Sequence, residues 1–149
     1  MIAIVVVWVL YMQRNAHIEP QGKILKVRTQ AMDENSSVAV VDFRMVNSSD
    51  YPIWVREVVV SLQGADGNTY DGAVVSETDA KALFRYYPLL GQKYNDSLIV
   101  RDRIHAHQTV DKMIAARFEM PQGQLDARKK LTVHIEDVDG PSGDLVETK

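Results

Sequence analysis

Residues 37–47, with the sequence SVAVVDFRMVN, are the clearest β-strand in the chain and decide the fold class. Alternate side chains of a strand point to the same face, and here four successive residues of one face are apolar. Asp42 and Arg44 occupy the opposite face, as in a strand that is half buried. The turn residues Asn47-Ser48-Ser49-Asp50 end it. The residues predicted to face the core are Ala39, Val41, Phe43 and Met45.

Six further stretches show strand patterning. They are residues 23–30, 53–62, 68–75, 97–104, 110–120 and 131–137. Asp66-Gly67-Asn68 lies between two of them and predicts a hairpin, because these residues tolerate positive φ. Seven alternating strands separated by turns are typical of a two-sheet sandwich. We therefore predict an all-β fold, an immunoglobulin-like antiparallel sandwich of about seven strands.

The predicted inward face of 53–62 carries one charged residue. Trp54, Val58, Val60 and Leu62 share a face with Arg56, which predicts a bulge or a sheet edge at that point. We expect Trp54 to be buried. The other predicted inward residues include Leu25 and Val27 in 23–30, Leu98 and Val100 in 97–104, and Ile114, Ala116 and Phe118 in 110–120.

One short helix interrupts the strands. Ser76 is a favourable N-cap with Asp79 three residues later, and Pro88 cannot continue a helix. The predicted helix is two to three turns at most. It leads into an apolar and aromatic segment, whose candidate binding residues are Phe84, Tyr86, Tyr87, Leu89 and Leu90. Such a segment either caps the sandwich or forms an interaction surface.

The composition excludes several functions. The 149 residues carry a net charge of −3, and Lys and Arg are scattered rather than clustered, so nucleic acid is not an expected partner. The chain has no cysteine, which excludes disulfides, thiolate catalysis and thiolate metal sites. It also lacks a G-x-S-x-G motif and a phosphate-binding glycine loop. We expect neither an enzyme nor a cofactor.

The candidate metal ligands are two histidines and two acidic clusters, one of which, Asp66, Asn68 and Asp71, is explained by its turn. His105 and His107 would face the same way on an extended strand, but a site needs a third ligand and His134 cannot be placed beside them. Solvated histidines next to a turn are the favoured interpretation. Residues 137–140, DVDG, have glycine at the fourth position instead of the sixth and do not fit a calcium loop. We predict no metal site.

The first twelve residues, MIAIVVVWVLYM, contain no charge and predict insertion into a membrane. Twelve helical residues span about 18 Å, whereas a bilayer core of about 30 Å needs roughly 20 residues. We therefore expect the anchor to extend upstream of Met1; a buried first strand is the alternative. The predicted anchor residues are Ile2, Ile4, Val5, Val6, Val7, Trp8, Val9, Leu10 and Tyr11, with the two aromatic side chains suited to the interface.

The predicted organisation has four parts. Residues 1–15 form a hydrophobic anchor with an N-terminal helix, 16–22 a linker, 23–138 the β-sandwich, and 139–149 a polar, mobile tail. Basic residues after the anchor, from Arg14 onward, would keep the domain in the cytoplasm by a literal positive-inside count. Single N-terminal anchors commonly display soluble domains outside, so we expect an extracytoplasmic domain, in the periplasm or at the cell surface.

Three stretches resemble known exported domains. They are residues 43–49, FRMVNSS; residues 58–62, VVVSL, followed by Asp66-Gly67; and residues 104–121, with Gln108-Thr109 and then FEMP. Together they are similar to telokin-like, immunoglobulin-like domains of bacterial envelope proteins and, more remotely, to late-embryogenesis-abundant type 2 domains. The resemblance covers about residues 23–138. It implies a sandwich without catalysis, used for binding or assembly.

The leading hypothesis is a membrane-anchored protein-binding or assembly module of the cell envelope. Its expected partners are the membrane and either another envelope protein or a second copy of the chain. The alternative is a structural subunit that polymerises through its apolar N-terminal helix, as pilins do. Pilins usually have a longer segment with Glu at the fifth residue, whereas this chain has Val5, so the alternative ranks lower.

Overall fold

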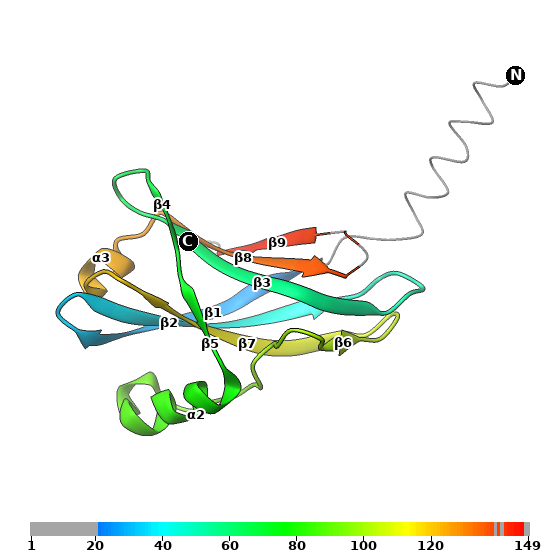
Figure 1. Ribbon diagram of the computed structural model, residues 1–149, viewed down its shortest axis with the longest axis horizontal. Coiled ribbons are helices and arrows are strands. Elements are labelled where there is room, and N and C mark those ends of the chain that lie inside the picture. Colours follow the sequence, from blue (N-terminus) through cyan, green and yellow to red (C-terminus); the bar gives the residue numbers. More distant parts are fainter. Residues whose placement is uncertain (1–20, 139, 141, 148–149) are drawn as a thin grey trace, which may run out of the picture.

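The computed structural model describes residues 21–138, 140 and 142–147 and shows two antiparallel sheets packed face to face (Figure 1). One sheet has the strand order β1-β2-β7-β5 and the other β4-β3-β8-β9, with β6 paired to β3. The predicted all-β sandwich is confirmed at this level. The predicted N-terminal anchor and its helix lie outside the described residues. The strands are β1 Gln21–Asp33, β2 Ser36–Val46, β3 Ile53–Gln63, β4 Thr69–Asp71, β5 Ala73–Val75, β6 Arg103–Ile104, β7 Thr109–Phe118, β8 Lys130–Asp137 and β9 Ser142–Val146.

The main core lies between the two sheets. The predicted inward residues of β2 and of β7 are fully buried there, and they face alternate residues of β3 and β8. Their alternation decides which side of each strand enters the core, because a one-residue shift would turn every side chain over. The central members of this core are Val41, Phe43, Val60, Leu62, Ile114, Phe118, Leu131, Val133 and Ile135.

Strand β2 is buried on both faces, which the sequence pattern did not predict. Val38 and Val40 point away from the core between the sheets and are completely inaccessible. Helix α2 (Glu77–Tyr86) and the 3₁₀ turn η1 (Pro88–Leu90) cover them. Figure 1 shows α2 on the side of the first sheet that faces away from β3 and β8. The inserted helix therefore adds a partial third layer rather than capping one end of the sandwich.

A bulge in β3 exposes Trp54, which was expected in the core. The pairing of β3 with β8 is shifted between Val55 and Glu57, so the bulge predicted at Arg56 is present. The extra residue moves the alternation by one place. Upstream of the bulge Ile53 and Val55 point inward, and Trp54 is 39% exposed on the outer face. The expectation of a buried tryptophan was wrong for this reason.

A second bulge lies in β1. The strand runs from Gln21, so the last two residues assigned to the linker belong to it. Its pairing with β2 is shifted between Ile24 and Lys26. Ile24 and Val27 consequently pack against the core, and Leu25 is 42% exposed instead of buried as predicted.

The predicted strand 68–75 divides between the two sheets. Residues of β4 pair with β3, whereas those of β5 pair with β7. Gly72 is the single residue between them, and its amide donates to the carbonyl of Val60 at 2.8 Å. A Cβ atom at this position would lie 2.7 Å from the Phe118 ring and 2.9 Å from the Ala116 side chain, so the crossing requires glycine.

Most of the predicted strand 97–104 is irregular. Ser97 forms an isolated bridge with Met113, and only β6 pairs with β3. Between them Arg101 adopts a positive φ of 78°, and its amide donates to the carbonyl of Val55 at 2.7 Å. Leu98 is buried as predicted, but Val100 is 55% exposed because the chain turns there.

The C-terminal residues predicted to form a mobile tail include a strand. Strand β9 pairs with β8 and buries Leu145. The following Glu147 forms a 2.6 Å ion pair with Arg128, and both side chains are almost inaccessible. Arg128 follows a short helix, α3 (Gln122–Asp126), which also was not predicted. The polar composition of β9 did not predict a strand. It forms one because its backbone pairs with the edge of β8.

Candidate functional site

The candidate binding segment is formed by α2 and η1. Ser76 caps the helix as predicted, and its hydroxyl accepts a hydrogen bond from the amide of Asp79 at 3.2 Å. The helix ends before Pro88, and the amide of Tyr87 still donates to the carbonyl of Leu83 at 2.9 Å. Ala80 and Leu83 form its buried side. The local sequence therefore explains where the segment starts, bends and stops.

The five predicted binding residues divide into two groups. Leu90 is 3% exposed, while Phe84 and Tyr87 are half buried; all three pack on the outer face of the first sheet. Tyr86 is 78% and Leu89 92% exposed. The segment therefore covers the outer face of the first sheet and leaves two large side chains in solvent, and its role as an interaction surface stays a prediction.

An open apolar groove lies beside Tyr86. Its volume is about 250 Å³, and it adjoins a second hollow of about 220 Å³ that shares Met32, Asp79 and Leu83. Small-molecule sites are usually about 300–1,000 Å³ and enclose their ligand. The groove is smaller and open, which suits one apolar side chain from a protein partner. Its lining residues are Met32, Asp79, Ala82, Leu83, Tyr86 and Tyr87.

Arg28 of β1 fixes the end of this segment to the sheet. Its guanidinium donates to the carbonyls of Leu90 at 2.9 Å and Gln92 at 2.6 Å, and it pairs with Asp42 at 2.9 Å. The side chains of Arg28 and Asp42 are only 9% and 5% exposed. The guanidinium also lies over the ring of Phe84, 4.9 Å from its centre. Charge-assisted hydrogen bonds of this kind are among the stronger ones in proteins.

Glu77 fixes the start of the helix to the loop after η1. One carboxylate oxygen pairs with Lys93 at 2.6 Å, and the other accepts the amide of Ser97 at 2.6 Å. Burial alone would raise the pKa of Glu77. The bonds from Lys93 and Ser97 outweigh it and lower the pKa to about 2. The segment is thus held at both ends by ionic contacts.

The sequence did not indicate Arg28, Met32 or Tyr94 as part of this site. Tyr94 is 62% exposed and lies on the Arg28 guanidinium, 5.4 Å from ring centre to carbon. Alternation in 23–30 places Arg28 on the face opposite Val27, but the carbonyls of Leu90 and Gln92 that it binds are more than sixty residues away in the sequence. Only the alternation in β1 was available as a signal, and alternation does not distinguish a solvated face from one covered by a helix.

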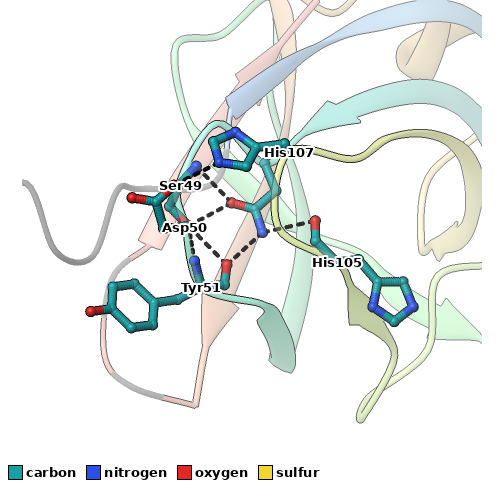
Figure 2. A network of polar contacts seen from close by, with 6 residues as sticks. Ser49, Asp50, Tyr51, His105 and His107 are labelled. Carbon is teal, nitrogen blue, oxygen red and sulfur yellow. Dashed lines mark hydrogen bonds and ion pairs between the residues drawn. The ribbon is translucent and has the colours of Figure 1, made fainter.

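A polar network joins two of the stretches that carry the family resemblance. Asn47 is buried, and its amide nitrogen donates to the carbonyls of Tyr51, Ile104 and His105 at 2.7–3.1 Å. Its amide oxygen accepts the hydroxyl of Ser49 at 2.7 Å. Figure 2 shows Ser49, Tyr51 and His105 gathered around this network. The network holds the loop after β2 against the turn before β7.

His105 and His107 do not face each other. They lie in the turn closed by the bond from the Gln108 amide to the His105 carbonyl, in which His107 has a φ of 58°. The ring of His107 contacts Asp50 at 2.7 Å, and Figure 2 shows the His105 ring directed elsewhere. His134 instead contacts Asp144 across β8 and β9. The two-residue spacing placed them on one face only under the assumption of an extended strand.

Two kinds of feature are absent from the described part of the chain. It contains no group of three His, Asp or Glu side chains arranged to hold a metal ion. None of its helices has the length and apolar character needed to cross a membrane. Comparisons of the whole chain with protein-family models, curated proteins and solved structures found no significant match.

Proposed function

We propose that this chain is a non-catalytic, membrane-anchored, extracytoplasmic module that binds another protein of the cell envelope or a second copy of itself. The observation that carries the proposal is the pair of exposed side chains Tyr86 and Leu89 on a segment that is otherwise packed and fixed. Large exposed apolar side chains beside a groove mark interaction sites. Anchoring rests on the apolar segment 1–12, and export on the usual placement of such domains.

The proposal includes an immunoglobulin-like fold for the sandwich. The order β1-β2-β7-β5 corresponds to strands A, B, E and D of that fold, and β4-β3-β8-β9 corresponds to C′, C, F and G. The crossing at Gly72 then takes the place of the C′ to D connection. Domains of this kind serve many functions, so the fold supports a binding role only together with the surface.

The binding surface is preorganised, which favours association. The contacts of Arg28 and Glu77 hold the segment, so little conformational entropy is lost when a partner binds. Leu89 protrudes from η1, and Tyr86 lies at the rim of the groove. The partner surface that fits is apolar, with one side chain able to enter the groove.

Photo-crosslinking in native membranes tests the proposal. A photoreactive amino acid replaces Leu89 in the full-length chain, and the matched control replaces Val146, an exposed aliphatic residue of β9 in the other sheet. We expect a discrete adduct from position 89 that is absent from position 146. The adduct should disappear when Tyr86→Ser is added. An adduct of twice the chain mass identifies a second copy, and any other discrete mass identifies a different protein.

Stability measurements provide the complementary control. Tyr86→Ser and Leu89→Ser should each change the unfolding free energy by less than about 0.5 kcal/mol, as surface substitutions do. Leu90→Ser should be strongly destabilising, because Leu90 is buried against the sheet. A large loss of stability from Tyr86→Ser, or identical adducts from positions 89 and 146, would refute a dedicated binding surface here.

A further inference from the structure

A second apolar surface lies at the end of the sandwich where the chain enters β1. Gln21 pairs with Val46, the last residue of β2, so β1 starts at the same end as the loop 47–52. Residue Val138, which follows β8, lies at this end too, and its amide donates to the carbonyl of Trp54 at 2.9 Å. Figure 1 shows these connections gathered at one end of the molecule.

Five of the eleven large hydrophobic side chains that are exposed in the described residues belong to this region. Backbone hydrogen bonds join residues 99–102 to the start of β3. The amide of Arg101 donates to the carbonyl of Val55, and the amide of Val55 donates to the carbonyl of Asp102. We call them the N-terminal end surface. Its members are Tyr51, Trp54, Ile99, Val100 and Val138, and each is between 39% and 55% exposed.

One arginine side chain of this region contacts an aromatic ring, and a second arginine lies on the adjoining turn. The guanidinium of Arg103 lies over the Trp54 ring at 5.2 Å, and Arg101 is held on the adjoining turn. Asp102 accepts the amide of Ile99 at 2.9 Å, so this acidic group is bound to backbone. Exposed tryptophan and tyrosine next to arginine are typical of the interface between lipid headgroups and acyl chains, where the ring is half apolar and the cation meets phosphate.

The length of the tether selects which part of the domain meets the membrane. Nine residues lead from Met12 to Gln21 and span at most about 30 Å when extended. Strand β1 has 13 residues and is about 43 Å long at 3.3 Å per residue. The tether is therefore shorter than the sandwich, so the end of the domain at Gln21 is tied within about 30 Å of the proposed anchor. This favours the N-terminal end surface over the opposite end as the part that meets the bilayer.

We propose that the N-terminal end surface rests on the headgroup region of the membrane that holds residues 2–11. This inference rests on the proposed anchoring and adds a second, non-covalent contact to it. Trp54 and Val138 enter the interface, and Arg101 and Arg103 meet the lipid phosphates. The contact orients the domain, so that the α2–η1 segment faces sideways along the membrane rather than toward it.

The two tryptophans of the chain provide the test. W8F leaves Trp54 as the only tryptophan, and W54F leaves Trp8 within the apolar segment. Each full-length variant is reconstituted into phosphatidylcholine vesicles with or without bromine on the acyl chains near the headgroup. Bromine quenches only tryptophan that lies close to it. A third variant adds Leu89→Trp to a chain without the two native tryptophans and reports on the α2–η1 segment.

We expect fluorescence loss from Trp8 and from Trp54 in brominated vesicles, and none from the tryptophan introduced at position 89. Quenching of Trp8 without quenching of Trp54 overturns this inference and leaves the anchor intact. A blue-shifted but unquenched emission of Trp54 likewise overturns this inference. It means that another part of the protein, and not the lipid, covers the surface. Absence of quenching from both native tryptophans refutes the anchoring itself. Equal quenching at positions 54 and 89 overturns the assignment of a specific surface. Unchanged circular dichroism of each variant excludes misfolding as the cause.

Discussion

Replacing Arg28 with methionine should strongly destabilise the domain, since among the described residues this arginine is the cation that pairs with the buried Asp42. The substitution keeps most of the aliphatic volume and removes the charge and three hydrogen bonds. The Asp42 carboxylate then stays 5% exposed, with the side-chain amide of Asn95 at 3.1 Å as its remaining side-chain contact.

The magnitude follows from the cost of leaving one charge of a buried pair alone. Such losses are typically about 3–5 kcal/mol. With a urea m value of about 2 kcal/mol/M, a loss of about 4 kcal/mol lowers the unfolding midpoint by about 2 M. Arg28→Met combined with Asp42→Leu removes both charges, and it should recover much of that loss because an apolar pair needs no solvation.

The assay is urea unfolding of the full-length protein in a mild detergent, followed by circular dichroism. Arg44→Met is the matched control, because Arg44 forms a 2.8 Å pair with Asp111 whose side chains are 41% and 38% exposed. That substitution should shift the midpoint little, since exposed ion pairs contribute little. Equal shifts for Arg28→Met and Arg44→Met, or a double substitution that is simply additive, would refute the assignment of Arg28 as a buried ionic contact.

Three further predictions follow from single residues. Asn47→Ala should cost about 1–3 kcal/mol in urea unfolding, because the buried carbonyl of Ile104 loses its side-chain donor; a loss below about 0.5 kcal/mol contradicts this. Gly72→Ala should lower the melting temperature, at a cost of about 1–3 kcal/mol from overlap with Phe118, whereas Gly123→Ala, in open space within α3, should leave it equal or higher. The pKa of Glu77 is lowered from 4.5 to about 2, so its contribution to stability is complete above pH 4.5 and is lost as the pH falls toward 2. Glu77→Gln should flatten the acid limb of a stability–pH curve, and an unchanged limb would show that other groups dominate it.

Much of the sandwich could be predicted from alternation, because the inward faces of β2, β7 and β8 are continuous. The bulge at Arg56 was also predictable, since a charge on an apolar face requires a local irregularity. The exposure of Trp54 was not predictable in the same way. A bulge turns over the residues on one side of it, and the sequence does not indicate which side keeps the original face. The bulge beside Leu25 left no charged marker in the sequence.

The remaining elements depend on long-range contacts. Strand β9 contains Gly143 and Asp144, which are poor strand formers, and it is held by pairing with β8. The residues 97–104 were predicted to form a regular strand from their apolar content, but they cross from one sheet to the edge of the other. A connection of that kind is set by where the two sheets lie and not by local propensity.

For the candidate site, composition indicated the segment but not its exposed members. Phe84 and Leu90 are packed, whereas Tyr86 and Leu89 face solvent. Within α2 the division follows the helical period, because Phe84 shares the side of Ala80 and Leu83 that packs on the sheet and Tyr86 does not. After the break at Pro88 the orientation of Leu89 and Leu90 is set by η1 instead. Residue type alone does not give that orientation.

The crossing at Gly72 has a consequence for how the molecule opens. A single residue connects β4, which belongs to one sheet, to β5, which belongs to the other. Separating the two sheets would therefore strain the pairs on either side of Gly72, Asp71 with Ser61 and Ala73 with Arg117. Native proteins open in contiguous cooperative units, and the short connection at Gly72 makes the two sheets parts of one such unit. We expect the amides of β3 and β7 to exchange with deuterium at the same slow rate, through one opening event of the whole sandwich rather than through two separate ones.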